Sequence, residues 1–218
     1  LEAAEGDGVL VWEVAADLDP LPFATDGRED AHEGEDAHDH GAFDPHFWLE
    51  PLRVAEAAQQ MAGHLSEVAP NGDWSSAADA YAAELEALHS ISVAQLAVVP
   101  ASDRKLVTNH LSLGYFSNLY DFETIGSVIP GGASLANPSS SELASLVEVI
   151  EREQVPAIFT ETIEPDVLAQ AVAAEVGYDV AVVELYTGSL GESGTDGDTL
   201  IGMLNVNVER IAEALGTP

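Results

Sequence analysis

The sequence contains no cysteine and only six basic residues among its 218. Without cysteine, the chain can form neither a disulfide nor a thiolate metal site. No apolar run approaches the roughly 18 residues of a membrane-spanning helix. The shortage of lysine and arginine excludes a nucleic-acid surface, because such surfaces neutralise phosphates with basic side chains. Glycine-rich nucleotide-binding motifs are also absent from the sequence.

Acidic residues are the main excess: there are 39 of them, and the formal net charge is −33. Such self-repulsion destabilises a compact state in ordinary salt. The acids form either a solvated shell suited to the high salt of a halophile, or one acidic tail or calcium-binding surface. They are scattered along the chain apart from a cluster in residues 29–39, which favours the halophilic interpretation.

The first part of the chain contains one candidate strand. Residues 9–14 are rich in β-branched and aromatic side chains and predict a buried strand. No second strand is expected before residue 105, and a lone strand has no ladder partner. The chain also starts without a methionine or a signal peptide. We therefore expect an incomplete N-terminal lobe, with the rest of it upstream of Leu1.

Residues 26–42 consist mainly of glycine, aspartate, glutamate and histidine, which predicts an exposed loop. Three histidines, His32, His38 and His40, lie in it.

Two helices are expected after this loop. Apolar positions recur with helical spacing from Pro51 to Val68, and residues 74–98 contain no glycine or proline. The second helix would be about 37 Å long, at 1.5 Å per residue. It lies between two unlike halves, which predicts a rigid connection. The expected organisation is a remnant N-terminal lobe (1–73), a connecting helix (74–99) and a C-terminal α/β lobe (100–218).

Beyond residue 100, candidate strands alternate with candidate helices four times. This alternation predicts an α/β fold in which a four-stranded parallel sheet is flanked by helices. Ligands of such sheets bind beyond the carboxyl ends of the strands. The expected strands are 105–108, 123–129, 157–160 and 179–185.

The motif Asp44-Pro45-His46-Phe47-Trp48-Leu49-Glu50-Pro51 holds the first candidate metal ligand. His46 lies between a proline and two aromatic residues, and Pro51 suits the first turn of a helix. Asp44 is two residues upstream, where a carboxylate can accept the second ring N–H of a metal-bound histidine. We predict that His46 binds a metal.

Two further candidates lie at the carboxyl edge of the expected sheet. His110 follows the first strand, and Glu161 ends the third. Residues 187–189, which end the fourth strand, line the same edge. Each candidate also has a purely structural interpretation: His110 as a capping or packed histidine, and Glu161 as a helix or loop cap.

Several motifs resemble the zinc/manganese substrate-binding proteins of ABC importers. They are the Asp44–Pro51 motif, Leu106-Val107-Thr108-Asn109-His110, Gly114-Tyr115-Phe116, Ala157-Ile158-Phe159-Thr160-Glu161 and Leu185-Tyr186-Thr187-Gly188-Ser189-Leu190. The resemblance implies two α/β lobes joined by one long rigid helix, with the metal held between the lobes.

The resemblance also implies a ligand set. His46 would be the second ligand and His110 the third, while the first would lie upstream of this chain. The fourth position, often an aspartate, falls on Gly188, which has no side chain for coordination. Glu161 is therefore kept as a candidate further ligand.

Two imidazoles with oxygen donors suit Zn(II), with Mn(II) as the alternative. Neutral imidazole is required, so affinity should fall below about pH 6.5. His32, His38 and His40 would collect zinc weakly near the cleft, unless the loop is simply an acidic linker.

The predicted function is capture of Zn(II) between two lobes and delivery to the permease of an ABC importer, by a protein that is not an enzyme. A manganese-specific binding protein, a metal-dependent adhesin and a zinc hydrolase are the alternatives. The sequence lacks His-Glu-x-x-His, which disfavours the hydrolase. We expect a monomer that lies outside the cytoplasm, at the cell surface or in an equivalent of the periplasm. An anchor in the N-terminal segment would hold it at the membrane.

Overall fold

The computed structural model of the chain describes residues 11–23, 43–129, 138–163 and 165–216. Its centre is a sheet of four parallel strands in the order β2-β1-β3-β4. The predicted α/β fold with a four-stranded parallel sheet is confirmed. The strands are β1 (Lys105–Thr108), β2 (Glu123–Ser127), β3 (Ala157–Glu161) and β4 (Ala181–Leu185).

Both faces of the sheet are covered, because successive residues of a strand point to opposite sides. Leu106 and Phe159 belong to one apolar core, while their neighbours Val107 and Ile158 belong to a second. The first core also contains residues of α4 (Gly114–Tyr120) and α7 (Leu200–Leu215). The second contains residues of α5 (Ser140–Glu153) and α6 (Val167–Glu175). Helices therefore flank the sheet on both sides.

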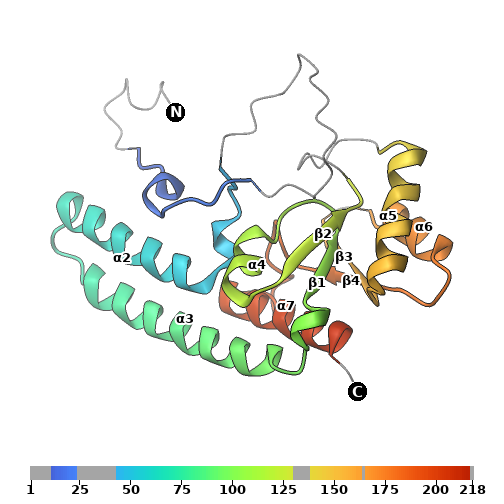
Figure 1. Cartoon of the computed structure of the whole chain (residues 1–218). Coiled ribbons are helices and arrows are strands. Elements are labelled where there is room, and N and C mark those ends of the chain that lie inside the picture. The colour runs from blue at the N-terminus through green and yellow to red at the C-terminus, as the bar shows by residue number, and fades with distance from the viewer. Residues whose placement is uncertain (1–10, 24–42, 130–137, 164, 217–218) are drawn as a thin grey trace, which may run out of the picture.

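Two long helices, α2 (Pro51–Val68) and α3 (Trp74–Leu96), lie side by side and extend away from the sheet (Figure 1). Pro51 is the first residue of α2, where the missing N–H costs no hydrogen bond. The α3 helix packs against α7, which joins it to the first core. The long helix therefore forms as expected, whereas the division into an N-terminal remnant, a connecting helix and a C-terminal lobe stays a prediction.

The predicted strand at residues 9–14 is wrong in its described part. Residues 11–13 are not in a strand, and Val14–Asp17 form a 3-10 helix, η1. The indole N–H of Trp12 donates a hydrogen bond to Asp17, and the Trp12 ring contacts the imidazole of His64 on α2. The side chain of Trp12 therefore packs on α2, and residues 11–13 do not pair as a β-strand. Residues 9 and 10 lie outside the described part, as does the predicted loop at 26–42.

Short 3-10 helices complete the described fold: η2 (Phe47–Leu49) precedes α2, and η3 (Ala101–Asp103) precedes β1. None of the described helices is long and apolar enough to cross a membrane.

Candidate metal centre

His46 lies directly before η2, and the Asp44 carboxylate holds it in place. Oδ1 of Asp44 lies 2.6 Å from Nδ1 of the His46 ring and accepts the backbone N–H of His46 at 2.9 Å. The Asp44 side chain is completely buried. A carboxylate on Nδ1 places the ring proton there, so the lone pair of Nε2 is available to a metal. Asp44 therefore lies where the sequence predicted it.

His110 follows β1, and Glu161 is the last residue of β3, the neighbouring strand. The backbone N–H of Asn109 donates to the carbonyl of Phe159 at 2.8 Å, which fixes the segment after β1 against β3. Nδ1 of His110 lies against Oε1 of Glu161. The sheet edge thus brings His110 and Glu161 together, as the order of the strands led us to expect.

The rings of His46 and His110 lie close together. Their ring centroids are 5.4 Å apart, and the ring planes are tilted by 58°. Each ring has a buried carboxylate on Nδ1: Asp44 for His46 and Glu161 for His110. The Asp44 contact at Nδ1 leaves Nε2 of the His46 ring as the nitrogen that can coordinate a metal. Two histidines that are 64 positions apart in the sequence therefore lie close together, each with a carboxylate beside its Nδ1.

Trp48, whose role at the site the motifs do not predict, connects the His46 segment to the segment that follows β4. Its indole N–H donates to the carbonyl of Thr187 at 2.7 Å, and its ring lies edge-on to His46 at 5.3 Å. The sequence does contain one indication of this role: an indole lies two residues from a candidate ligand, and a buried indole N–H needs a hydrogen-bond acceptor. Residues 187–189 thus reach the site through Thr187. Gly188 lies beside Ile163.

Tyr115 on α4 fixes the backbone of Asp44. Its hydroxyl donates to the carbonyl of Asp44 at 2.9 Å and accepts the N–H of Leu21 at 3.1 Å. Burial raises the pKa of Tyr115 above its usual range, so the hydroxyl keeps its proton and remains a donor. The guanidinium of Arg53 lies over the Tyr115 ring, 4.9 Å from its centroid.

Arg53 ties the N-terminal segment to the start of α2. It pairs with Glu50 at 2.9 Å and donates to the backbone carbonyls of Leu18 and Asp19. Burial raises the pKa of Glu50, although the Arg53 guanidinium acts against this rise. The segment that carries His46 is therefore held by α2 on one side and by α4 on the other.

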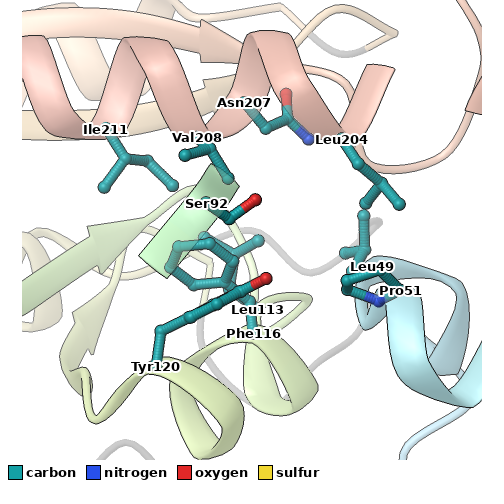
Figure 2. Close-up of a pocket in the computed structure, with 10 residues that line it drawn as sticks. All are labelled: Leu49, Pro51, Ser92, Leu113, Phe116, Tyr120, Leu204, Asn207, Val208 and Ile211. Atoms are coloured by element: carbon teal, nitrogen blue, oxygen red, sulfur yellow. The ribbon is translucent and has the colours of Figure 1, made fainter. Parts of the chain in front are cut away.

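A small cavity lies between the start of α2, α3, α4 and α7 (Figure 2). It is lined mainly by apolar side chains, including Leu49, Phe116 and Val208. Its free volume is about 10 Å³, which is at the lower limit for a single water molecule. This cavity is a packing gap and not a binding site for a ligand.

The described residues do not supply a complete coordination shell. Among them, no three histidine, aspartate, glutamate or cysteine side chains are grouped so that they can hold one metal ion. His46 and His110 come together, and each has its own carboxylate. His32, His38 and His40 lie outside the described residues.

Comparison with known families gives one match that covers nearly the whole chain. Residues 1–214 match the model of a family described as ZnuA, the periplasmic component A of the zinc-uptake complex. The zinc-binding protein TroA of Treponema pallidum is 30% identical over 180 residues, which are 79% of this chain and 58% of that protein. The manganese-binding lipoprotein MntA of Halalkalibacterium halodurans is 27% identical over 210 residues, 95% of this chain and 64% of that protein.

A solved structure of the periplasmic zinc-binding protein TroA of Treponema pallidum has a similar fold. It superimposes with a TM-score of 0.80 at 25% identity, covering 99% of this chain and 75% of that one. The chain thus spans less than two thirds of the full length of TroA and MntA.

Proposed function

The chain belongs to the family of ZnuA, the zinc-uptake complex component A, and from that premise we propose that the full-length protein captures Zn(II) outside the cytoplasm for an ABC importer. Relatives are named as zinc-binding or manganese-binding proteins, and one is a substrate-binding lipoprotein of a metal ABC transporter. These names describe binding proteins and no enzyme, in agreement with the expected function. The permease of the importer is the proposed partner.

The observation that carries this proposal is the spacing of the two imidazoles. A zinc ion bound to two Nε2 atoms at about 2.0–2.1 Å with a tetrahedral angle separates the ring centroids by about 5.2 Å. The rings of His46 and His110 are 5.4 Å apart. The spacing of the two ring centroids therefore fits one shared ion.

Each carboxylate behind the pair supports the same role. A carboxylate on the far nitrogen orients a ligating imidazole and increases its basicity. We propose this role for Asp44 at His46 and for Glu161 at His110. Direct coordination by Glu161 is the alternative, although its Oε1 is paired with Nδ1 of His110. The remaining ligands would come from outside the described residues.

The proposed metal is Zn(II), with Mn(II) as the alternative. Two imidazoles favour zinc, because manganese is better served by carboxylate, carbonyl and water oxygens. We expect the full-length protein to bind zinc at least about 100-fold more tightly than manganese, in line with the order of divalent affinities. Competition titrations with a chelating indicator measure both constants. Equal affinities, or tighter binding of manganese, would assign the site to Mn(II).

We further propose that His32, His38 and His40 collect zinc and raise its concentration near the pair. The proposal comes from the sequence, in which three histidines lie among acidic residues just before the Asp44–Pro51 motif. Deletion of residues 28–41 should slow zinc uptake by cells at limiting zinc and leave uptake at abundant zinc unchanged. A deletion variant that takes up limiting zinc like the parent would show the segment to be only a linker.

The relatives named as lipoproteins support a location at the membrane surface, outside the cytoplasm, and we propose it for the full-length protein. A monomer is the proposed state, because one site of this kind needs no second copy. Neither the hydrolase nor the adhesin alternative is favoured by a contact described above.

A further inference from the structure

Gly114, the first residue of α4, lies against the carboxylate that holds His46. A Cβ atom placed on Gly114 would come closer than 3.0 Å to Oδ2 of Asp44, and real Cβ atoms essentially never approach so closely. The backbone of Gly114 does not demand glycine, because it is helical and its φ lies outside the left-handed region. Alanine also has the higher helix propensity. Glycine at this position therefore leaves space for the Asp44 carboxylate, and the backbone conformation alone would not require it.

The Asp44 carboxylate has little freedom to move away from an added methyl group. Its backbone is fixed at both polar groups: the N–H donates to the carbonyl of Leu21 at 2.8 Å, and the carbonyl accepts from Tyr115. Its Oδ1 is bonded to both the backbone and the ring of His46. A short side chain on a fixed backbone can respond only by rotating about χ1 or χ2. Such a rotation would break the Oδ1 contact with Nδ1 of His46.

We propose that Gly114 is a positioning residue for His46, which acts by leaving room for the Asp44 carboxylate. The absence of a side chain at this position keeps Oδ1 of Asp44 on Nδ1 of His46 and so fixes the orientation and the tautomer of the His46 ring. This inference rests on the proposed metal-binding role of His46. It explains why the Asp44–Pro51 and Gly114-Tyr115-Phe116 motifs act as one unit: Gly114 and Tyr115 fix the side chain and the backbone of the same aspartate.

The test compares Gly114→Ala with Gly63→Ala in the full-length protein. Gly63 is a helical glycine on α2, and an added Cβ there would have no atom within 4 Å besides its chain neighbours and the backbone of its own helix, so its variant is the matched control. The first readout needs no metal: long-range 15N–1H spectra report whether Nδ1 or Nε2 of His46 carries the proton. We expect one fixed tautomer with the proton on Nδ1 in the parent and in Gly63→Ala. Gly114→Ala should show the averaged signals of a mixed population.

The second readout is zinc affinity in a double-mutant cycle with Asp44→Ala. Gly114→Ala and Asp44→Ala should each weaken zinc binding by about 10–100-fold, the usual effect of losing the partner of a ligating histidine. The double variant should bind like Asp44→Ala alone, because no carboxylate then remains to be displaced. Additive losses, or an unchanged His46 tautomer in folded Gly114→Ala, would overturn the proposal. If Gly114→Ala changes the His46 tautomer but the parent does not bind zinc, the proposed function is wrong and the positioning role of Gly114 still holds.

Discussion

Replacing His46 or His110 with alanine is expected to weaken zinc binding by more than 100-fold in the full-length protein. Loss of only the hydrogen-bond partner of a ligating histidine typically reduces metal affinity about 10–100-fold, so loss of the histidine itself should reduce it further. Removing the imidazole removes the metal–nitrogen bond as well. The two rings are 5.4 Å apart, so each variant leaves only one imidazole of the pair at the site. Isothermal titration calorimetry, with a competing chelator for the parent, measures the change.

The matched control for these variants is His64→Ala. His64 is on α2, where its ring contacts Trp12. Its loss should change zinc affinity by less than about twofold, while a thermal melt of each variant checks that it is folded. The double variant His46→Ala/His110→Ala should bind zinc about as weakly as either single variant. Any further loss should be limited to residual nonspecific binding. Parent-like affinity in both single variants would show that the metal is bound elsewhere.

The second large effect is expected in stability, as a function of salt. The chain has 39 acidic residues and six basic ones. Several basic residues are already occupied within the fold: Arg53 pairs with Glu50, and Lys105 and Arg152 both pair with Glu153. Repulsion among the remaining acids is screened as the Debye length falls from about 10 Å at 0.1 M to about 3 Å at 1 M. We expect the free energy of unfolding to rise by several kcal/mol, which raises the melting temperature on the order of 10 °C for a chain of this size.

Thermal unfolding in increasing KCl measures this effect, and sucrose at matched water activity is the control. Sucrose also strengthens burial through exclusion from the surface, but it does not screen charge. The gain in KCl should therefore be much larger than the gain in sucrose. A melting temperature that stays level up to molar KCl would contradict the halophilic interpretation of the composition.

The parallel sheet was predictable because its strands are short apolar runs between clear turn and cap signals. The start of α5 is an example: Ser139-Ser140-Ser141-Glu142 has the sequence pattern of a capping box, and the reciprocal hydrogen bonds of Ser139 and Glu142 are present. The strand predicted at 9–14 failed because the same β-branched and aromatic content also suits packing on a helix. Trp12 contacts the His64 ring and donates a hydrogen bond to Asp17. Neither interaction produces a periodic pattern of apolar residues that could be recognised in the sequence.

The candidate centre was predictable only as far as local rules extend. Asp44 and His46 are two residues apart, and a carboxylate at that spacing is a known device for orienting a ring. His110 and Glu161 could be brought together because both end neighbouring strands of a parallel sheet. The contacts of Trp48 with Thr187 and of Gly114 with Asp44 join segments 70 or more positions apart. Such contacts depend on the angles at which helices pack, which no motif encodes.

The claim that His46 and His110 share one ion is tested most directly by X-ray absorption at the zinc edge on the zinc-loaded full-length protein. The spectrum should show nitrogen scatterers at about 2.0–2.1 Å with the outer-shell pattern of at least two imidazoles. That pattern should lose one imidazole in His46→Ala and in His110→Ala. A first shell made only of oxygen atoms, or an imidazole pattern unchanged in both variants, would contradict the shared site.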